Sequence, residues 1–410
     1  MMTKPPVDYK YLFIDMNAYF ASVEQLDHPS WRGQPVAVSP FLGPSGCVIA
    51  ASYEAKALGV TTGHRVGDAI KAIPSIHIAQ ARPRRYVQIH EQIKKIVEDY
   101  SPWIEPRSID EFSILVSPED RTPDRTQEIT QSIKSRIRSD IGPAIRASIG
   151  IGPNVFLAKM ATELKKPDGL VTITMDNLES IFNSIDEMTA ICGINFALAG
   201  RLAWHNLHRP IDLWRAPANQ LKNILGQPGD GWYLRLHGYD NDYLPQKIPK
   251  SVGHSHVLAP EMRVRAKARQ VMHKLAYKVA TRLLSQKLLA TQLWIGVRFL
   301  SAGSWHQSVK MAPNNNSQDI CRIALHLFDR APEHAPLLLS VTATNLGLST
   351  KRPQKLLPED AKYQYLDEAQ ATVNHRFGPE TIIPANLLAI EDAAPYRIAF
   401  GKPQEPTTKQ

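Results

Sequence analysis

Three acidic residues, Asp15 in the run FIDMNAYFASVE and the adjacent Asp110 and Glu111 in EPRSIDEFSI, are suited to a two-metal phosphoryl-transfer site. Two divalent cations lying close together need carboxylates on rigid backbone, so that they can activate an attacking oxygen and stabilise a leaving one. Hard oxygen ligands of this kind suit Mg²⁺. We therefore predict that these three residues are catalytic and hold two magnesium ions. Taken alone, however, an Asp-Glu pair is most often a solvated turn.

Each carboxylate is expected where a strand ends. The apolar run YLFI before Asp15 predicts a buried strand, and the segment from Ala18 through AYFASVEQL predicts a helix. The run FSILV after Glu111 and the break at Pro106 predict two strands that meet near SIDE. Neighbouring residues of a strand point to opposite faces, so a turn or bulge must bring Asp110 and Glu111 to one site.

Four runs, in this order, resemble the motifs of the Y-family translesion DNA polymerases, the DinB/UmuC group. FIDMNAYFASVE resembles the first motif, and AASYEAKALGVTTG (50–63) resembles the triphosphate-binding motif. SIDE (108–111) resembles the second acidic motif, and ASIGIGPNVFLAKMATELKKPDGL (147–170) resembles the stretch that closes the palm domain. The resemblance covers about the first 170 residues with high specificity and continues more weakly beyond them.

This resemblance implies a template-directed DNA polymerase that adds deoxynucleotides to a primer 3′-hydroxyl opposite damaged DNA. Its partners would be primer-template DNA and deoxynucleoside triphosphates. Asp15 and Asp110 would bridge both metal ions, and Glu111 would hold the ion next to the primer hydroxyl. The backbone carbonyl of Met16 would complete the ligands of the ion on the nucleotide side.

The resemblance also implies a set of phosphate-binding residues. The backbone amides of Ala18 and Tyr19 enter a helix and would face a phosphate, because helix starts carry unsatisfied donors and a partial positive charge. Tyr53, Lys56 and Lys166 would hold the triphosphate of the incoming nucleotide.

Phe20 occupies the position of the family's steric gate, where a bulky ring leaves no room for a 2′-hydroxyl. The alternative for Phe20 is a core aromatic on the inner face of its helix. Three residues depart from the family pattern. Lys56 replaces the usual Arg and offers a point charge in place of a bidentate donor, Asn17 stands where many relatives have a second Asp, and Ala50 stands where a hydroxyl is frequent.

Together with the order of the predicted strands and helices, the resemblance implies an α+β fold with a right-hand polymerase architecture. The palm would be ferredoxin-like, the fingers small and the thumb helical, and a second ferredoxin-like pattern would form the little finger. The expected ranges are 1–24 and 74–174 for the palm, 25–73 for the fingers, 175–245 for the thumb, 251–347 for the little finger and 348–410 for a C-terminal extension.

Two regions are expected to contact DNA. TAICGINFALAGRLAWHNLH (189–208) resembles a helix-hairpin-helix whose turn CGIN would offer Gly193 and Asn195 to a phosphate, with left-handed backbone tolerated by Asn195. Plain helix packing is the alternative there. In the little finger, Arg298 and Lys310 on a predicted hairpin would lie along the DNA. The cations of the long helix before it could also touch phosphates, although a charged helix face is more often solvated. These cations are Arg263, Arg265, Lys267, Arg269, Lys274, Lys278 and Arg282.

The C-terminal extension gives weaker signals. QKLLPED (354–360) faintly resembles the peptides that bind sliding clamps but lacks their terminal aromatic, so a clamp is only a candidate partner. The end GKPQEPTTKQ is expected to be disordered.

Composition agrees with a nucleic-acid partner. The 410 residues carry a formal net charge of +9, which attracts phosphate backbones, although a merely basic cytosolic protein would show the same excess. The 3 cysteines lie far apart without metal-binding spacing, which predicts reduced thiols. Without a membrane-length apolar stretch or a signal peptide, we expect a soluble cytoplasmic protein.

Two other functions remain open at this stage. One is a catalytically weak, polymerase-shaped accessory factor that binds damaged DNA. Buried neighbouring carboxylates argue against it, because they are costly without metal ions to neutralise them. The other is a nucleotidyl cyclase, which also uses a ferredoxin-like palm but needs neither a helix-hairpin-helix nor a second basic sheet domain.

Overall fold

The computed structural model describes residues 5–240, 248–349, 358–378, 381–390 and 394. These residues divide into two compact units, one formed by the residues up to 240 and the other by those from 248 onward.

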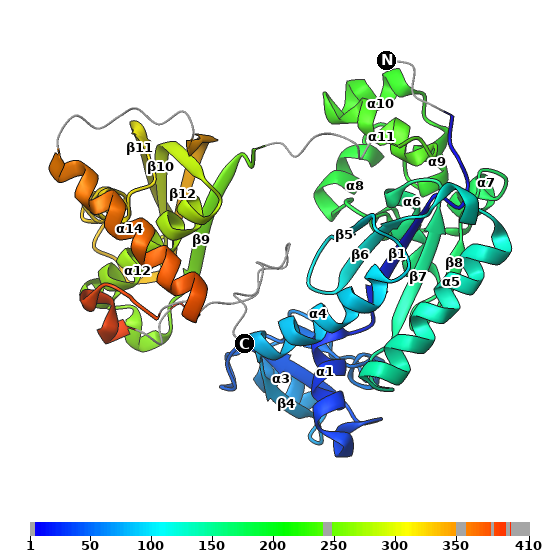
Figure 1. Ribbon diagram of the computed structural model, residues 1–410, viewed down its shortest axis with the longest axis horizontal. Coiled ribbons are helices and arrows are strands. Elements are labelled where there is room, and N and C mark those ends of the chain that lie inside the picture. The colour runs from blue at the N-terminus through cyan, green and yellow to red at the C-terminus, as the bar shows by residue number, and fades with distance from the viewer. Residues whose placement is uncertain (1–4, 241–247, 350–357, 379–380, 391–393, 395–410) are drawn as a thin grey trace. The chain divides into compact units, whose positions relative to one another are not determined.

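The first unit is built on a five-stranded sheet with the strand order β5-β6-β1-β7-β8 (Figure 1). Strand β1 lies between β6 and β7 and is antiparallel to both, so the first strand of the chain is at the centre of the sheet. Helix α4 precedes the β5-β6 pair and α5 precedes β7, which gives the ferredoxin-like palm that the sequence predicted. The elements are β1 (Tyr11–Met16), α4 (Pro83–Glu98), β5 (Ile104–Pro106), β6 (Glu111–Leu115), α5 (Pro123–Arg136), β7 (Ala147–Gly152) and β8 (Leu170–Thr172).

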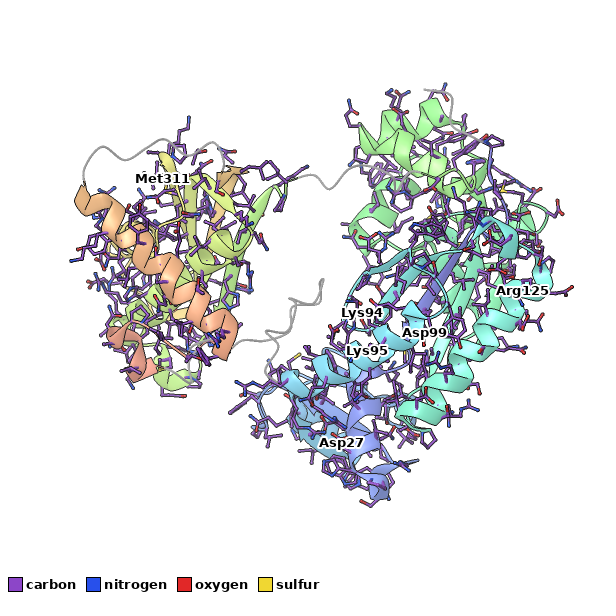
Figure 2. The ribbon with its side chains drawn as sticks, viewed as in Figure 1. Asp27, Lys94, Lys95, Asp99, Arg125 and Met311 are labelled. Atoms are coloured by element: carbon purple, nitrogen blue, oxygen red, sulfur yellow. The ribbon has the colours of Figure 1, made fainter. Side chains whose placement is uncertain are left out.

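The two faces of this sheet pack against different helices. Leu12 and Ile14 of β1 share a core with Ile89 and Ile93 of α4, which recur at helical spacing. The charged Lys94 and Lys95 of the same helix are labelled in Figure 2. Phe13 points to the other face, where it packs against α6 (Val155–Leu164). Because side chains alternate along a strand, Asp15 lies on the same face as Phe13 and away from α4.

The part of the chain between α1 and α4 forms a smaller, three-stranded sheet with the strand order β3-β2-β4. Its core contains small residues such as Ala37, Ala51 and Ala55. The last strand of this sheet, β4, lies beyond residue 73, where the fingers were expected to end. The elements are α1 (Tyr19–Asp27), β2 (Val36–Ser39), β3 (Ala50–Ala51), α2 (Tyr53–Ala57), α3 (Val66–Ala72) and β4 (His77–Gln80).

The region from 175 to 240 is helical, as predicted. Its core shares Leu157 and Met160 of α6, so these helices pack against the end of the palm. The helices are α7 (Leu178–Ser184), the single-turn η4 (Met188–Ala190), α8 (Phe196–Ala203), α9 (Pro210–Arg215), α10 (Ala218–Leu225) and α11 (Pro228–Leu236).

The second unit has the predicted order of strand, helix, hairpin, helix and strand. Its four strands are arranged β11-β10-β12-β9, so the last of them lies between the first and the second. This arrangement differs from that of the palm, although the order of elements is the same. The elements are β9 (Ser251–Val257), α12 (Arg265–Ser285), β10 (Leu288–Phe299), β11 (Ser304–Asn314), α13 (Ser317–Phe328), β12 (Pro336–Leu348) and α14 (Pro358–Phe377).

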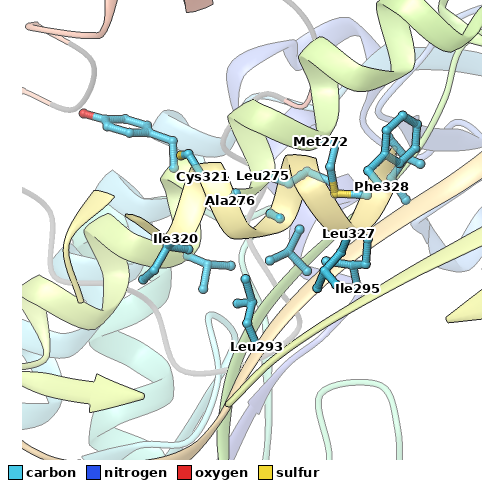
Figure 3. Close-up of a cluster of buried hydrophobic side chains, with 14 of the residues drawn as sticks. Met272, Leu275, Ala276, Leu293, Ile295, Ile320, Cys321, Leu327 and Phe328 are labelled. Atoms are coloured by element: carbon cyan, nitrogen blue, oxygen red, sulfur yellow. The ribbon is translucent and has the colours of Figure 1, made fainter. Parts of the chain in front are cut away.

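One face of this sheet is covered by helices. Figure 3 shows Met272 and Leu275 of α12 packed with Leu293 and Ile295 of β10 and Leu327 of α13. The interpretation of α12 as a phosphate-binding or solvated helix is wrong for Lys274 and Lys278. Both are buried, because α12 packs between the sheet and further segments of its own unit.

Two expectations fall largely outside the described residues. Residues 354–357 of the clamp-like run are not described, and its last residues, 358–360, begin α14. The end GKPQEPTTKQ also lies outside the described residues. Within the described part of the chain, we find no helix that combines the length and apolar character needed to span a membrane.

Candidate active site

Two of the three predicted carboxylates are direct partners across neighbouring strands. Asp15 of β1 lies opposite Glu111 of β6 in the antiparallel register, so both side chains are on the same face of the sheet. Asp110 lies in the turn just before β6, and its backbone carbonyl accepts a hydrogen bond from the Met16 amide at 2.9 Å. The turn is closed by the amide of Arg107, which donates to the Glu111 carbonyl at 2.9 Å. The sequence analysis predicted such a turn. It brings all three acidic residues together at one end of the inner strands β1 and β6, the predicted catalytic edge of the sheet.

Burial makes the charges at this edge unfavourable. It raises the pKa of Asp15 from 3.8 to about 7, even though Lys166 pairs with this carboxylate at 2.9 Å and opposes the rise. Burial also raises the pKa of Asp110, which accepts a hydrogen bond from the Ser108 hydroxyl. Glu111 pairs with Lys159 at 2.6 Å.

The same contacts determine how the site relates to metal ions. In the described residues, no three His, Cys, Asp or Glu side chains are grouped so that they could hold a metal ion as they stand. Each of the three carboxylates instead contacts a lysine or a hydroxyl. The donor set nevertheless fits magnesium, because it consists of carboxylate oxygens whose burial makes a compensating cation favourable.

The predicted triphosphate-binding residues lie beside this edge. Helix α2 begins at Tyr53, and the Lys56 ammonium lies 4.6 Å from the centre of the Tyr53 ring. Burial lowers the pKa of Lys56, and the nearby Lys166 lowers it further while Asp15 raises it. The structure therefore places Tyr53, Lys56 and Lys166 close enough to Asp15 to interact electrostatically with its carboxylate.

The start of α1 has an unusual backbone. Ala18 precedes the helix with φ 45° and ψ 44°, a left-handed conformation that is uncommon for a residue with a side chain. The following amides of Tyr19 and Phe20 are in the first helical turn, which has no intrahelical acceptors for them. Next to it, Asn17 donates to the Ser148 hydroxyl at 3.0 Å and accepts from the Asp168 amide at 2.7 Å. These bonds tie Asn17 to the β7 side of the sheet.

Phe20 is 8% exposed and belongs to the palm core. Its ring stacks on that of Tyr86 with a centroid distance of 4.5 Å and an interplanar angle of 21°. Burial alone fits both a steric gate and a core aromatic, so only a measurement of sugar selection separates the two roles.

The turn predicted to contact DNA has a different backbone from the one expected. Gly193 adopts the left-handed conformation with φ 86°, and a β-carbon there would lie 3.6 Å from the Trp232 ring. The expectation of left-handed backbone at Asn195 is wrong. Asn195 is extended, with φ −93°, because it is the N-cap of α8 and its side chain accepts the Leu198 amide at 2.8 Å.

Arg298 and Lys310 share the uncovered face of the second unit's sheet. Leu293, Ile295 and Val297 of β10 point to the helices, so the alternate residues Gln292 and Arg298 point away from them. Lys310 lies opposite Gln292 and is therefore on that same outer face. Both cations are exposed there.

Comparisons with known proteins agree with this arrangement. The model of the impB/mucB/samB family matches residues 14–163, and that of the family's C-terminal domain matches residues 249–357. DNA polymerase IV of Oceanobacillus iheyensis is 30% identical, with 83% of this chain and 81% of the relative covered. The chain belongs to the impB/mucB/samB family.

A further relative matches nearly the whole chain, and two solved structures match most of it. DNA polymerase IV 1 of Bacillus subtilis is 29% identical over 95% of both chains. Among solved structures, a Y-family DNA polymerase chimera of Dbh and Dpo4 superposes with a TM-score of 0.70 at 23% identity, covering 82% of this chain and 99% of the other. An insertion ternary complex of Dbh DNA polymerase gives a TM-score of 0.55 at 22% identity over the same shares. These structures support the fold.

The prediction of a Y-family translesion DNA polymerase is therefore confirmed. The enzyme class is that of a DNA-directed DNA polymerase. Family membership favours it over both the accessory factor and the nucleotidyl cyclase.

The sequence analysis missed the partners of the acidic residues. Lys159 pairs with Glu111, while Glu163 pairs with Lys166 at 2.6 Å. A signal was present for Lys159 and Glu163, because they are four residues apart within α6 and so share one side of this helix. Lys166 lies just beyond the end of α6, three residues after Glu163. Tyr86 under Phe20 had no comparable signal.

The raised pKa of Asp15 gives the protein a specific pH dependence. In magnesium-free buffer, the folded state keeps a proton on Asp15 that the unfolded chain loses near its ordinary pKa of 3.8. This proton contributes at most about 4 kcal/mol to the free energy of unfolding. The whole contribution is present below about pH 4, and it is lost as the pH rises through about 7. The melting temperature of the wild type should therefore fall from pH 5 to pH 8 relative to that of Asp15→Asn.

Circular dichroism melting in the presence of a chelator measures this difference. Asp99→Asn is the control, since Asp99 is an exposed carboxylate on the palm (Figure 2). Adding Mg²⁺ should raise the wild-type melting temperature more at pH 8 than at pH 5. Parallel pH profiles of the wild type and Asp15→Asn would show that Asp15 is ionised throughout.

Proposed function

We propose that this DNA polymerase transfers deoxynucleotides by a two-metal mechanism at the edge formed by Asp15, Asp110 and Glu111. The observation that carries the proposal is the opposed pair Asp15 and Glu111 on one face of the palm sheet, with Asp110 in the adjoining turn. Cationic and hydrogen-bonding side chains lie beside this pair and suit a triphosphate.

The three carboxylates and the Met16 carbonyl would hold two magnesium ions. When bound, these ions would supply activation of the primer hydroxyl and neutralisation of charge on the transferring phosphoryl group. A cation bound to Asp15 or Glu111 competes with the lysine that now pairs with that carboxylate. Lys166 is thus available for the triphosphate once its partner carboxylate is neutralised by another charge.

Tyr53, Lys56 and Lys166 bind the triphosphate in this proposal. Their proximity to Asp15 directs the phosphate chain toward the catalytic edge. The left-handed Ala18 supports it by turning its own amide and that of Tyr19, the first residue of α1, toward the same anion. Phe20, in the first turn of that helix, is proposed as the gate that excludes a 2′-hydroxyl.

Primer-template DNA is held by the remaining parts. We assign the palm to 1–24 and 74–174, the fingers to 25–73, the thumb to 175–245 and the little finger to 251–347. The turn at Gly193 and Asn195 contacts a DNA phosphate, and Arg298 and Lys310 contact the backbone from the outer sheet face. A sliding clamp remains a candidate partner through the run 354–360. The three free thiols support a cytoplasmic location.

Primer extension on undamaged and abasic templates, with Mg²⁺ and four deoxynucleoside triphosphates, tests the proposal. We expect extension of the undamaged primer and insertion opposite the abasic site. A folded preparation that binds the primer-template but extends neither substrate would refute the proposed site.

The outer face of the second sheet gives a salt-dependence prediction. Replacing both Arg298 and Lys310 by alanine should weaken DNA binding and reduce the slope of log K against log salt by about 1.8, because each phosphate that is no longer neutralised lowers the slope by about 0.9. The double variant Arg322→Ala and Arg330→Ala is the matched control, because it removes two exposed cations from α13 and the turn after it, on the covered side of the sheet. Fluorescence anisotropy at several salt concentrations measures both slopes. Equal slopes for the two double variants would remove Arg298 and Lys310 from the DNA interface.

A further inference from the structure

We propose that the buried carboxylate of Glu24 is a positioning residue for sugar selection, because it fixes the ring of Tyr86 on which Phe20 lies. The proposal deepens the function proposed above and rests on the role of Phe20 as the gate. Glu24 lies at the opposite end of α1 from the catalytic edge and is not one of the residues assigned to substrate.

The ring of Tyr86 is the support of Phe20. The two rings are stacked at 4.5 Å between centroids, and Tyr86 itself is only 1% exposed. Its backbone carbonyl accepts a hydrogen bond from the Tyr19 hydroxyl at 2.6 Å. Because the supporting ring is buried and stacked on Phe20, a shift of Tyr86 changes the surface on which the Phe20 ring lies.

A single polar contact fixes the far end of the supporting ring. The Tyr86 hydroxyl donates to Glu24 Oε1 at 2.7 Å, and the Glu24 side chain is 2% exposed. A hydrogen bond to a buried carboxylate is strong and directional, so it determines both the depth and the tilt of the ring.

The carboxylate is itself held in place by a guanidinium. Arg82 donates to both oxygens of Glu24, from Nε at 3.1 Å and from Nη2 at 2.7 Å. The same Nη2 donates to Asp27 at 2.8 Å, and Arg85 pairs with Asp27 at 2.7 Å. An ion pair whose guanidinium is 40% exposed contributes little net stability. Its orienting effect on Tyr86 is therefore the more specific role for Glu24.

The network of Glu24, Asp27, Arg82 and Arg85 also joins two segments that are far apart in the chain. Glu24 and Asp27 belong to the last turns of α1, while Arg82 and Arg85 lie at the start of α4. The chain between them forms the small sheet β3-β2-β4. The network thus joins the two connections between the palm and the small sheet, near Asp27 in Figure 2. Any movement of these connections is transmitted through Glu24 to Tyr86 and to the proposed gate.

Tyr86→Phe tests the proposal, because it keeps the ring but removes its bond to Glu24. The measured quantity is the ratio of kcat/KM for a ribonucleotide to kcat/KM for the matching deoxynucleotide. One missing methylene in an apolar pocket changes discrimination by about 10-fold to 200-fold. Because the Phe20 ring would be shifted and not removed, the ratio should rise by about 10-fold, at the lower end of this range. Deoxynucleotide insertion should change much less. Glu24→Gln should raise the ratio in the same direction.

Tyr100→Phe is the matched control, since the Tyr100 hydroxyl bonds to Ser132 at 2.7 Å elsewhere in the palm. Its ratio should equal that of the wild type even if its melting temperature falls as much as that of Tyr86→Phe. If Glu24→Gln does not fold, Tyr86→Phe alone decides the test.

The outcomes separate this proposal from the one on which it rests. If Phe20→Ala raises the ratio and Tyr86→Phe leaves it unchanged, Phe20 is the gate and the role of Glu24 is overturned. If Phe20→Ala leaves the ratio unchanged, the gate is wrong and the role of Glu24 fails with it. A rise in Tyr86→Phe that is absent from Tyr100→Phe supports the proposal.

Discussion

Asp110→Ala should lower primer extension by at least about 10³-fold while DNA binding stays intact or becomes slightly stronger. The expected loss is large because this carboxylate would bridge both metal ions, and charge stabilisation of the transferring phosphoryl group depends on them. Binding should not weaken, because the substitution removes a negative charge from the proposed primer site. Single-turnover extension measures the first effect and anisotropy with labelled primer-template measures the second.

A control of equal charge makes this result specific. Asp99→Ala also removes one carboxylate from the palm, but Asp99 is exposed and pairs with Arg136 at 2.7 Å. Its extension rate should stay within about 2-fold of the wild type, since exposed ion pairs contribute little. Near wild-type extension by Asp110→Ala would mean that the chemistry takes place elsewhere in the chain.

The sequence predicted the elements that carry the site, because each has a local signal. The isoleucines Ile89, Ile93 and Ile96 recur at helical spacing and form the inner face of α4. The need to bring Asp110 and Glu111 to one place predicted the turn before β6, and the structure has one there. Periodicity and turn chemistry act over a few residues, so they can be read without the fold.

The partners of the site residues could not be predicted in this way. Glu111 and Lys159 are 48 residues apart and meet only because α6 packs on the face of the sheet that carries Asp15. Lys274 and Lys278 were misjudged for the same reason. A run of charges on a helix indicates an exposed face only when one side of the helix is free, and α12 is enclosed by other parts of its unit.

The backbone of the thumb turn shows a subtler limit. Asn195 favours both the left-handed conformation and the N-cap position, so its residue type does not choose between them. Gly193 takes the left-handed position two residues earlier, and Asn195 is then free to cap α8. Asn195 thus fits the turn as an N-cap and not, as expected, through left-handed backbone.

Phe20→Ala should raise ribonucleotide insertion relative to deoxynucleotide insertion by about 100-fold, since a whole ring is removed and even one methylene can alter discrimination by about 10-fold to 200-fold. The ring would otherwise occupy the space that a 2′-hydroxyl needs. Steady-state insertion of one ribonucleotide and the matching deoxynucleotide, measured on the same folded preparation, gives the ratio.

The competing account of Phe20 predicts a different result. As a buried core aromatic, it would cost about 3 to 5 kcal/mol of stability when truncated to alanine, and both insertion reactions would fall together. Phe112→Ala is the matched control, because Phe112 is fully buried in the same palm core. It should lower stability by a similar amount and leave the ratio unchanged. If both variants lose stability but only Phe20→Ala changes the insertion ratio, the Phe20 ring is the gate. General weakening of the core would act on both nucleotides alike.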